Sequence, residues 1–288
     1  MTMRAVSLVL ALSAVAIVPF VVRGDRPGAY PWPRSGSSDG GTIESRFDAP
    51  DGYARVAVAE GSFGAWLRGL PLLPGKPDVL LFDGELKGNQ SAQVAVIDLD
   101  VGKRDLQQCA DAVIRLRAEY LLQAGRGRDV CFRFTNGEPA AWTRWADGLR
   151  PVIDGRRTSW VKKAKAASGY SVFRDYLTVV FRYAGTASLE RELTLADRVE
   201  PGDVFIEGGF PGHAVIAVDV AASPAGRAVL LAQSYMPAQQ VHVLVNPGDP
   251  AMSPWYRHDA SAALETPEWR FDSGRAMRFP ERGCPPRR

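Results

Sequence analysis

The chain has 288 residues, 46% of them hydrophobic and 23% charged, which are ordinary values for a globular protein. Its net charge of +3, from 35 basic and 32 acidic residues, is too even for a protein that binds nucleic acid through a basic face. A chain of this length buries a sizeable core without disulfide staples. We therefore expect one large domain or two small ones, and no nucleic-acid partner.

The first two dozen residues have the pattern of an export segment. Arg4 supplies a short positive region, residues 5–22 are apolar apart from two serines, and Arg23 ends the run. Residues 14–16, Ala-Val-Ala, fit a cleavage site, but the apolar run is also just long enough to span a bilayer. We expect residues 1–23 to be a signal peptide or a membrane anchor. The protein is then exported, and is either periplasmic or anchored in the inner membrane facing the periplasm.

The rest of the chain divides by composition. Residues 24–50 are rich in Gly, Ser, Pro and Asp, which favours a flexible linker. We expect one domain over residues 51–280 and a basic tail over residues 281–288.

Within the domain, apolar patterns predict the elements in chain order. Strands are expected over residues 54–58, 79–82, 93–100 and 130–134, and helices over residues 106–123, 172–183 and 188–193. The last third predicts consecutive antiparallel strands over residues 203–206, 213–220, 228–235 and 241–245. Because a helix-bearing half precedes a sheet, the order favours an α+β fold over a wound parallel sheet.

Three cysteines, Cys109, Cys131 and Cys284, leave at least one thiol unpaired. Their spacing fits neither a zinc ribbon nor a disulfide framework, and whether Cys131 pairs with Cys284 depends on geometry that the sequence does not give. No His-x-x-x-His pattern or paired carboxylate–histidine spacing is present, so we expect no metal and no other cofactor. An unpaired thiol in an exported protein needs an explanation.

Cys109 lies near the start of the predicted helix over residues 106–123, to which we assign Asp105 as the N-cap. Unpaired N–H groups and the helix dipole favour a thiolate at a helix N-terminus. Cys109 follows Asp105 by four positions, so it gains this effect only if the helix begins nearer Gln108. The alternative is a buried structural thiol on the apolar face of the helix.

His213 opens a predicted strand directly after a glycine-rich loop, residues 208–212. Such a loop lets the main chain approach a substrate, and His213 is the candidate general base for Cys109. The other interpretation is a structural histidine at the end of a strand.

A polar group should orient the imidazole of His213. Asp219 lies six residues along the same strand, roughly 20 Å away at about 3.3 Å per residue, and is too distant. Pairing with the next strand puts Ser234 opposite His213, or Gln233 after a shift of one residue. Gln233 is the best candidate because its amide oxygen accepts a hydrogen bond from the imidazole N–H, and Ser234 is second. The alternative for Gln233 is an ordinary polar strand residue.

The sequence resembles two known protein families. The first resemblance rests on residues 61–71, 105–113, 115–120, 202–206 and 231–238. With these matching stretches, the chain resembles over nearly its whole mature length an uncharacterised family of bacterial envelope proteins, domain of unknown function number forty-eight forty-six.

The second resemblance is to the NlpC-type branch of papain-like cysteine peptidases. It rests on the order of Cys109 on a helix, Pro-Gly-Asp-Val-Phe at residues 201–205, a glycine-rich loop, and His213 on a strand followed by a polar residue on the next strand. This resemblance implies a papain-like or NlpC-like fold, with a helix half packed on an antiparallel sheet. It also implies Cys109 as nucleophile, His213 as base and Gln233 as the third member.

The resulting functional hypothesis is a cell-envelope cysteine amidohydrolase or peptidase that acts on amide bonds of the peptidoglycan type. The alternative is a non-catalytic envelope module that binds glycan or protein through exposed aromatic rings. The candidate rings are those of Trp66, Trp142, Trp145, Trp160, Trp255 and Trp269. The expected partner is accordingly peptidoglycan or an envelope protein.

Overall fold

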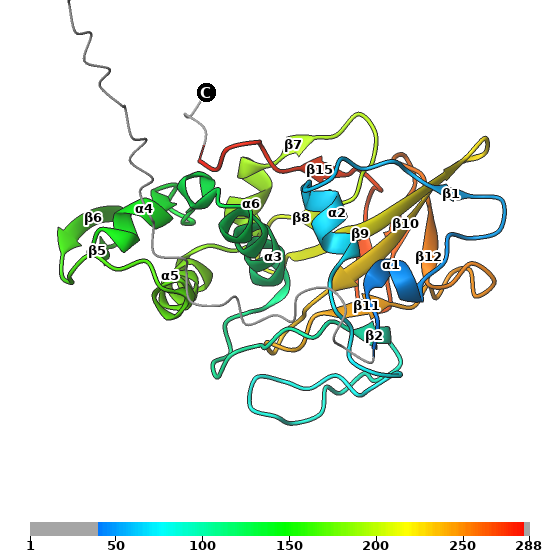
Figure 1. Ribbon diagram of the computed structural model, residues 1–288, viewed down its shortest axis with the longest axis horizontal. Helices are drawn as coiled ribbons and strands as arrows, with labels where there is room; N and C mark the ends of the chain where they lie inside the picture. The colour runs from blue at the N-terminus through cyan, green and yellow to red at the C-terminus, as the bar shows by residue number, and fades with distance from the viewer. Residues whose placement is uncertain (1–39, 285–288) are drawn as a thin grey trace, which may run out of the picture.

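The computed structural model describes residues 40–284, and its main feature is a nine-stranded sheet (Figure 1). The strands follow the order β2-β11-β10-β9-β8-β15-β7, while β1 pairs with β9 and β12 pairs with β10. All of these pairings are antiparallel. The strands of the sheet are β1 (Ala54–Arg55), β2 (Gln93–Val96), β7 (Thr194–Leu195), β8 (Val204–Glu207), β9 (His213–Ser223), β10 (Gly226–Gln233), β11 (His242–Leu244), β12 (Trp255–His258) and β15 (Met277–Arg278).

Three short hairpins and the helices complete the described part of the chain. The hairpins pair β3 (Cys131–Arg133) with β4 (Pro139–Ala141), β5 (Leu149–Asp154) with β6 (Arg157–Lys162), and β13 (Leu264–Glu265) with β14 (Arg270–Phe271). The helices are α1 (Ile43–Arg46), α2 (Phe63–Arg68), α3 (Cys109–Gln123), α4 (Trp142–Ala146), α5 (Tyr170–Tyr183) and α6 (Thr186–Glu192), with a 3-10 turn η1 (Gly127–Asp129). In Figure 1, α3 and α6 lie between the sheet and a separate end built from α4, α5 and the β5–β6 hairpin.

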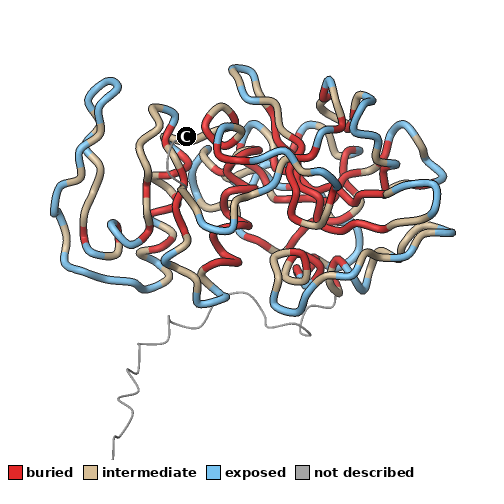
Figure 2. The backbone as a smooth tube through the Cα atoms, turned by 90° about the horizontal axis from the view of Figure 1, so that it is seen from above, coloured by how far each residue is buried: buried red, intermediate tan, exposed pale blue. Residues whose placement is uncertain are grey.

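The hairpin of β9 and β10 forms the centre of the fold because both faces of β9 are buried. Ala214, Ile216 and Val218 join the apolar cluster that includes α3, whereas Val215 and Ala217 join a second cluster. This alternation is what a pleated strand with both faces covered requires. Figure 2 shows the buried residues running through the middle of the molecule, with exposed residues at the loop and hairpin tips.

One charged residue interrupts this apolar strand. Asp219 has no solvent exposure, and its two carboxylate oxygens each lie 2.6 Å from an arginine nitrogen, one of Arg55 and one of Arg68. A buried carboxylate is tolerated when cations and hydrogen bonds compensate its lost hydration. The cluster therefore ties β1 and α2 to the centre of the sheet, and Asp219 has a structural role.

The expected α+β fold, with a papain-like or NlpC-like helix half packed on an antiparallel sheet, is wrong. The structure is 22% helical and a large antiparallel sheet dominates it. Strands come from both sides of the helical region, because β1 and β2 precede α3. The hairpins β3–β4 and β5–β6 also interrupt that region, and the β5–β6 hairpin was missed because its side chains lack a clear apolar alternation and β5 contains a proline.

The folded part begins earlier than the composition indicates. The helix α1 lies inside the expected linker over residues 24–50, and Ile43 is fully buried in the main core. The expected signal or anchor over residues 1–23 lies outside the described residues, as do residues 285–288 of the expected basic tail. Between residues 40 and 284, no helix has the length and apolarity needed to span a membrane.

Cys131 on β3 and Cys284 near the end of the chain form a disulfide, with their Cα atoms 5.4 Å apart. The bond joins residues that are 153 positions apart in the sequence. It fastens the C-terminal segment to β3 and stabilises the fold by restricting the unfolded chain. Cys109 is the free cysteine, and it is buried.

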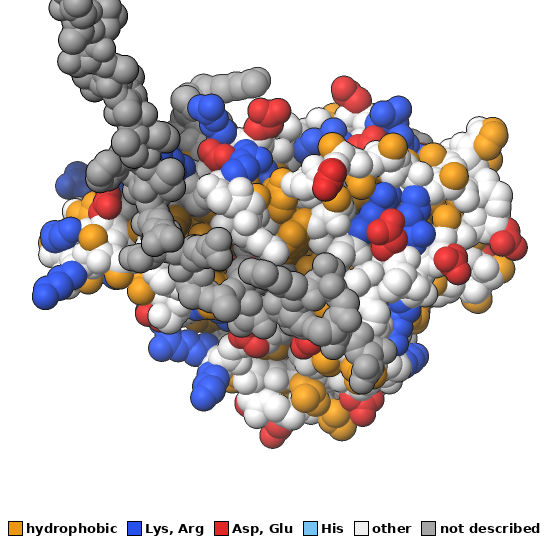
Figure 3. Space-filling view, in the orientation of Figure 1, with side chains coloured by type: hydrophobic (Ala, Val, Ile, Leu, Met, Phe, Trp, Pro, Cys, Tyr) orange, Lys and Arg blue, Asp and Glu red, His pale blue; other side chains and the backbone are white. Residues whose placement is uncertain are grey.

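Charge is mixed on the surface visible in Figure 3. Lys and Arg side chains are interspersed there with Asp and Glu side chains, and neither sign covers the whole face. This matches the near balance of basic and acidic residues in the sequence.

Candidate functional site

Cys109 is the first residue of α3, and Gln108 is the N-cap. The expectation that Asp105 caps a helix beginning at residue 106 is therefore wrong. Asp105 Oδ1 instead accepts hydrogen bonds from the main-chain N–H of Ala238 at 2.7 Å and from the Gln108 side chain at 2.9 Å. The acid that serves the helix terminus is Asp111, whose Oδ2 accepts from the N–H of Gln108 at 3.3 Å. The later start places the Cys109 thiol among the unpaired N–H groups of the first turn.

A cleft of about 450 Å³ opens over this helix terminus. Its walls are the first turn of α3, Phe181, residues 184–186, the glycine-rich loop over residues 209–212, and Met236. Phe210 and Met236 are exposed by 88% and 52%, so large apolar side chains border the cleft. Cys109 lines the cleft while being only 7% exposed, so its sulfur lies in the wall and is not freely solvated.

Burial dominates the electrostatics of the thiol. It raises the pKa of Cys109 to about 11, and the neighbouring Asp111 adds to the increase. Main-chain hydrogen bonds from Ala110 and Ala214 act in the opposite direction because they favour the thiolate. At neutral pH the thiol is therefore protonated, and a nucleophilic role requires a base that removes its proton.

Gln233 and His213 lie in direct contact. The Oε1 atom of Gln233 is 2.8 Å from Nε2 of His213, and both side chains are 1% exposed. Burial lowers the pKa of His213 to about 4, and the hydrogen bond with Gln233 opposes this decrease. The imidazole is therefore neutral at physiological pH, as a general base must be before it accepts a proton.

The strand register differs from both of the pairings considered from the sequence. Gly226 pairs with Ser223, and a β-bulge between Leu230 and Leu231 shifts the pairing by one residue. Gln233 then reaches His213 diagonally across the strand pair. Ser234 does not orient the ring, because its Oγ lies 2.8 Å from the carbonyl oxygen of Gln239 and 3.0 Å from that of Gln107.

Cys109 and His213 meet at the same end of β9 without bonding directly. The sulfur contacts the N–H of Ala214, the residue after His213, and it also interacts electrostatically with Tyr235. The ring of Tyr235 lies 4.9 Å from the imidazole of His213. Among the described residues, no hydrogen bond joins the sulfur to the imidazole, and His213 instead packs against Trp269 and Phe271 at 5.3 Å and 5.9 Å.

Three functional candidates escaped the sequence analysis. Glu268 and Lys87 form a largely buried ion pair at 2.7 Å, and Glu268 also accepts from the side chain of Gln233. His242 on β11 pairs with Gln233 on β10. Lys87 and Glu268 stand in turn-rich segments with no motif, so only the three-dimensional contacts identify them.

The aromatic surface proposed for a binding module is largely internal. Trp142, Trp145 and Trp255 are 2–6% exposed and belong to the main apolar core. Trp269 donates its N–H to Glu207 at 3.0 Å and packs on His213. The rings therefore do not form one exposed sugar-stacking face. Within residues 40–284, no group of three His, Cys, Asp or Glu side chains is arranged to hold a metal ion.

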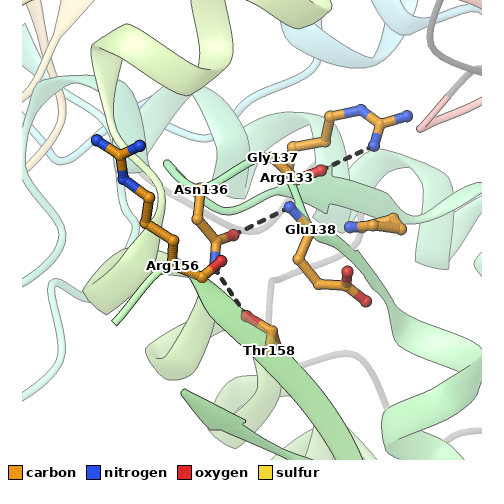
Figure 4. Close-up of a pocket in the computed structure, with 7 residues that line it drawn as sticks. Arg133, Asn136, Gly137, Glu138, Arg156 and Thr158 are labelled. Carbon is orange, nitrogen blue, oxygen red and sulfur yellow. Dashed lines mark hydrogen bonds between the residues drawn. The ribbon is translucent and has the colours of Figure 1, made fainter. Parts of the chain in front are cut away.

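A second hollow, of about 370 Å³, lies between the β3–β4 turn and the β5–β6 hairpin (Figure 4). Asn136 is fixed there by Oγ1 of Thr158 at 2.8 Å and by the N–H of Glu138 at 3.0 Å. In Figure 4 the guanidinium groups of Arg133 and Arg156 point away from one another. Side chains in this hollow do not converge on a common point, so the cleft at Cys109 is the stronger candidate.

Comparison with known proteins assigns the chain to a family. The family model described as Domain of unknown function (4846) matches residues 43–278, which include α1, the cleft, and the strands that carry His213 and Gln233. The chain belongs to this family. No curated protein and no solved structure matches the chain significantly.

Proposed function

We propose that the protein is an exported cysteine amidohydrolase that cleaves amide bonds of the peptidoglycan type. The observation that carries the proposal is the meeting, at one end of β9, of a thiol in a cleft and an oriented imidazole. Cys109 supplies the thiol at the first position of α3, and Gln233 holds the His213 ring through a 2.8 Å contact. The apolar export pattern of residues 1–23 supports an envelope substrate.

The mechanism starts from a neutral thiol and a neutral imidazole. As the sulfur of Cys109 attacks the amide carbonyl, His213 removes the thiol proton. Gln233 accepts the other imidazole N–H and orients the imidazolium, although it stabilises that cation less than a carboxylate does. Because the resting structure has no sulfur–imidazole hydrogen bond, substrate binding must bring the two groups together, as is common at catalytic sites.

The negative charge on the carbonyl oxygen needs donors that are already in position. The first N–H groups of α3 have no partner within the helix, and that of Ala110 already points at the Cys109 sulfur. As the sulfur forms its bond to the carbonyl carbon, these N–H groups lie beside the carbonyl oxygen and can donate to it. His213 then transfers its proton to the leaving amine, and the acyl group remains on Cys109 as a thioester. Water activated by His213 hydrolyses the thioester and regenerates the thiol.

The chain order of these groups adds support. Cysteine on a helix, histidine at the start of a strand, and a polar residue on the next strand follow the same order as in NlpC-type peptidases. This likeness is one of order and chemical role, and it carries no statement about the fold.

A non-catalytic binding module is the second candidate. One observation favours it: the burial and raised pKa of Cys109 are also properties of an inert core thiol. The test below separates the two candidates.

The experiment is digestion of purified peptidoglycan by the exported domain, followed by chromatography of the released fragments and assay of new amino groups. Cys109→Ala abolishes release, and His213→Ala lowers the rate by about 10²–10⁴-fold. The matched control is His258→Ala, since His258 contacts the carbonyl of Gly274 and lies outside the cleft lining. Equal digestion by wild type and Cys109→Ala, or no digestion by wild type on any peptidoglycan tested, would reject the hydrolase in favour of the binding module.

A further inference from the structure

A buried chain of polar groups continues from His213 into the interior. Gln233 contacts His213 on one side and Glu268 on the other, and Lys87 contacts Glu268. Their side chains are hidden from solvent, with Lys87 4% and Glu268 11% exposed. Polar groups buried to this degree need hydrogen-bond partners, so every donor must lie opposite an acceptor.

The contact with Glu268 determines how the amide of Gln233 is oriented. An amide can be turned over so that its oxygen and its NH₂ group exchange places, and the hydrogen-bond network decides between the two. The carboxylate of Glu268 lies 2.7 Å from one end of this amide and is a hydrogen-bond acceptor, since it is paired with Lys87. The NH₂ group of Gln233 must therefore face Glu268, and its oxygen must face His213.

His242 favours the same orientation through a longer contact. Its Nδ1 lies 2.9 Å from the carbonyl oxygen of Gln240, so that nitrogen carries the proton. Its Nε2 is then an acceptor, 3.4 Å from the Gln233 side-chain nitrogen and 3.5 Å from Nζ of Lys87. Two acceptors thus surround the NH₂ end of Gln233.

The consequence reaches His213. When an amide oxygen faces Nε2, that nitrogen must carry the proton, and in a neutral imidazole the proton-accepting lone pair is then on Nδ1. Nδ1 is the ring nitrogen nearer the main chain, where the N–H of Ala214 meets the Cys109 sulfur. With the amide reversed, the proton would move to Nδ1 and the base would face away from the thiol.

We infer that Glu268, held by Lys87, is a positioning residue that fixes the orientation of the Gln233 amide and thereby the tautomer of His213. The role of this tautomer in proton removal rests on the proposed function, but the tautomer itself does not. Glu268 acts through Gln233 and touches neither Cys109 nor the cleft lining.

The test is NMR spectroscopy of the full chain with isotope-labelled histidine at neutral pH, where the ring-nitrogen shifts distinguish the two tautomers. The chain has 3 histidines, and each signal is assigned by its loss in a single variant. Wild-type His213 is expected with its proton on Nε2. In Glu268→Ala the share with the proton on Nδ1 rises about fivefold, the change that loss of one ordinary hydrogen bond produces.

A double variant covers the case in which Glu268→Ala leaves Lys87 as a lone buried charge and unfolds the chain. Lys87→Met with Glu268→Met removes both charges together, and the same tautomer shift is expected. The matched control is Glu265→Ala, on the same hairpin but 59% exposed and paired with Arg270, and it leaves the tautomer unchanged.

Two results overturn the inference: a wild-type His213 protonated on Nδ1, or an unchanged tautomer in the double variant. Failure of the proposed function is a separate result. If the tautomer shifts in the variants while wild type and Cys109→Ala both leave peptidoglycan intact, the positioning role stands and the hydrolase does not.

Discussion

Alkylation of Cys109 across pH tests the electrostatic description of the site. Only the thiolate reacts with iodoacetamide, and Cys131 and Cys284 are held in a disulfide, so labelling of the unreduced chain reports on Cys109. Burial raises its pKa from 9.0 to about 11. At pH 7 the thiolate fraction is then about 100-fold smaller than for an ordinary cysteine thiol, and the native chain should be labelled about 100-fold more slowly.

The dependence of the labelling rate on pH is more informative than its absolute value. The rate should rise about tenfold per pH unit from neutrality and level off only near the pKa of about 11. Restricted access lowers the rate by the same factor at every pH, so the midpoint reports the pKa alone. The denatured, disulfide-intact chain is the control, with the ordinary midpoint near 9.0.

A native midpoint below that of the denatured chain would refute this reasoning. Fast labelling near pH 6 that is lost in His213→Ala would mean that a thiolate–imidazolium pair already exists at rest. The mechanism would then begin from an ion pair and not from a neutral thiol and a neutral imidazole.

The remaining predictions concern stability. Asp219→Asn should lower the free energy of unfolding by about 3–5 kcal/mol in urea titration, because it leaves two arginines around a buried neutral group; an effect below about 1 kcal/mol would contradict this. Burial raises the pKa of Glu192 from 4.5 to about 7, so the carboxyl group of Glu192 stays protonated to higher pH in the folded state than in the unfolded chain. The contribution of Glu192 to stability should therefore fall by about 3 kcal/mol as pH rises from 4.5 to 7. The difference in unfolding free energy between wild type and Glu192→Gln should change by that amount over this range, and a constant difference would contradict the prediction. Reduction of the Cys131–Cys284 disulfide should cost about 2–5 kcal/mol, and an unchanged melting temperature after complete reduction would argue against the bond.

The order of the strands around the candidate site could be predicted from local patterns. The run from β8 to β11 forms consecutive antiparallel neighbours, as the apolar stretches and short connections of the last third indicate. The contact between Gln233 and His213 was also expected, although the strand register from which it was predicted differs from the observed one. Its register depends on a bulge at Leu230 and Leu231, and nothing in two adjacent leucines marks a bulge.

The class of fold could not be predicted. A likeness in the order of a few residues was extended to a papain-like architecture, but order along the chain does not determine which strands join one sheet. The last two strands at one end of the sheet, β15 and β7, are two residues each, too short to give a periodic signal.

The surroundings of Cys109 and Gln233 could not be predicted from the sequence either. Asp105, the expected N-cap of α3, instead accepts from the N–H of Ala238, which lies 133 residues away. Glu268 contacts Gln233 although the two are 35 positions apart in the sequence, and no sequence motif indicates this contact. Such contacts are set by tertiary packing, and local patterns carry no information about them.

The central claim is that Cys109 forms a covalent bond with its substrate. The most direct measurement is the intact mass of the chain, quenched in acid during incubation with peptidoglycan peptides. We expect a peptide adduct on Cys109 that hydroxylamine removes, as it removes thioesters, and that is absent from Cys109→Ala. Cleavage products formed equally by Cys109→Ala, with no adduct on the wild-type chain, would contradict the claim.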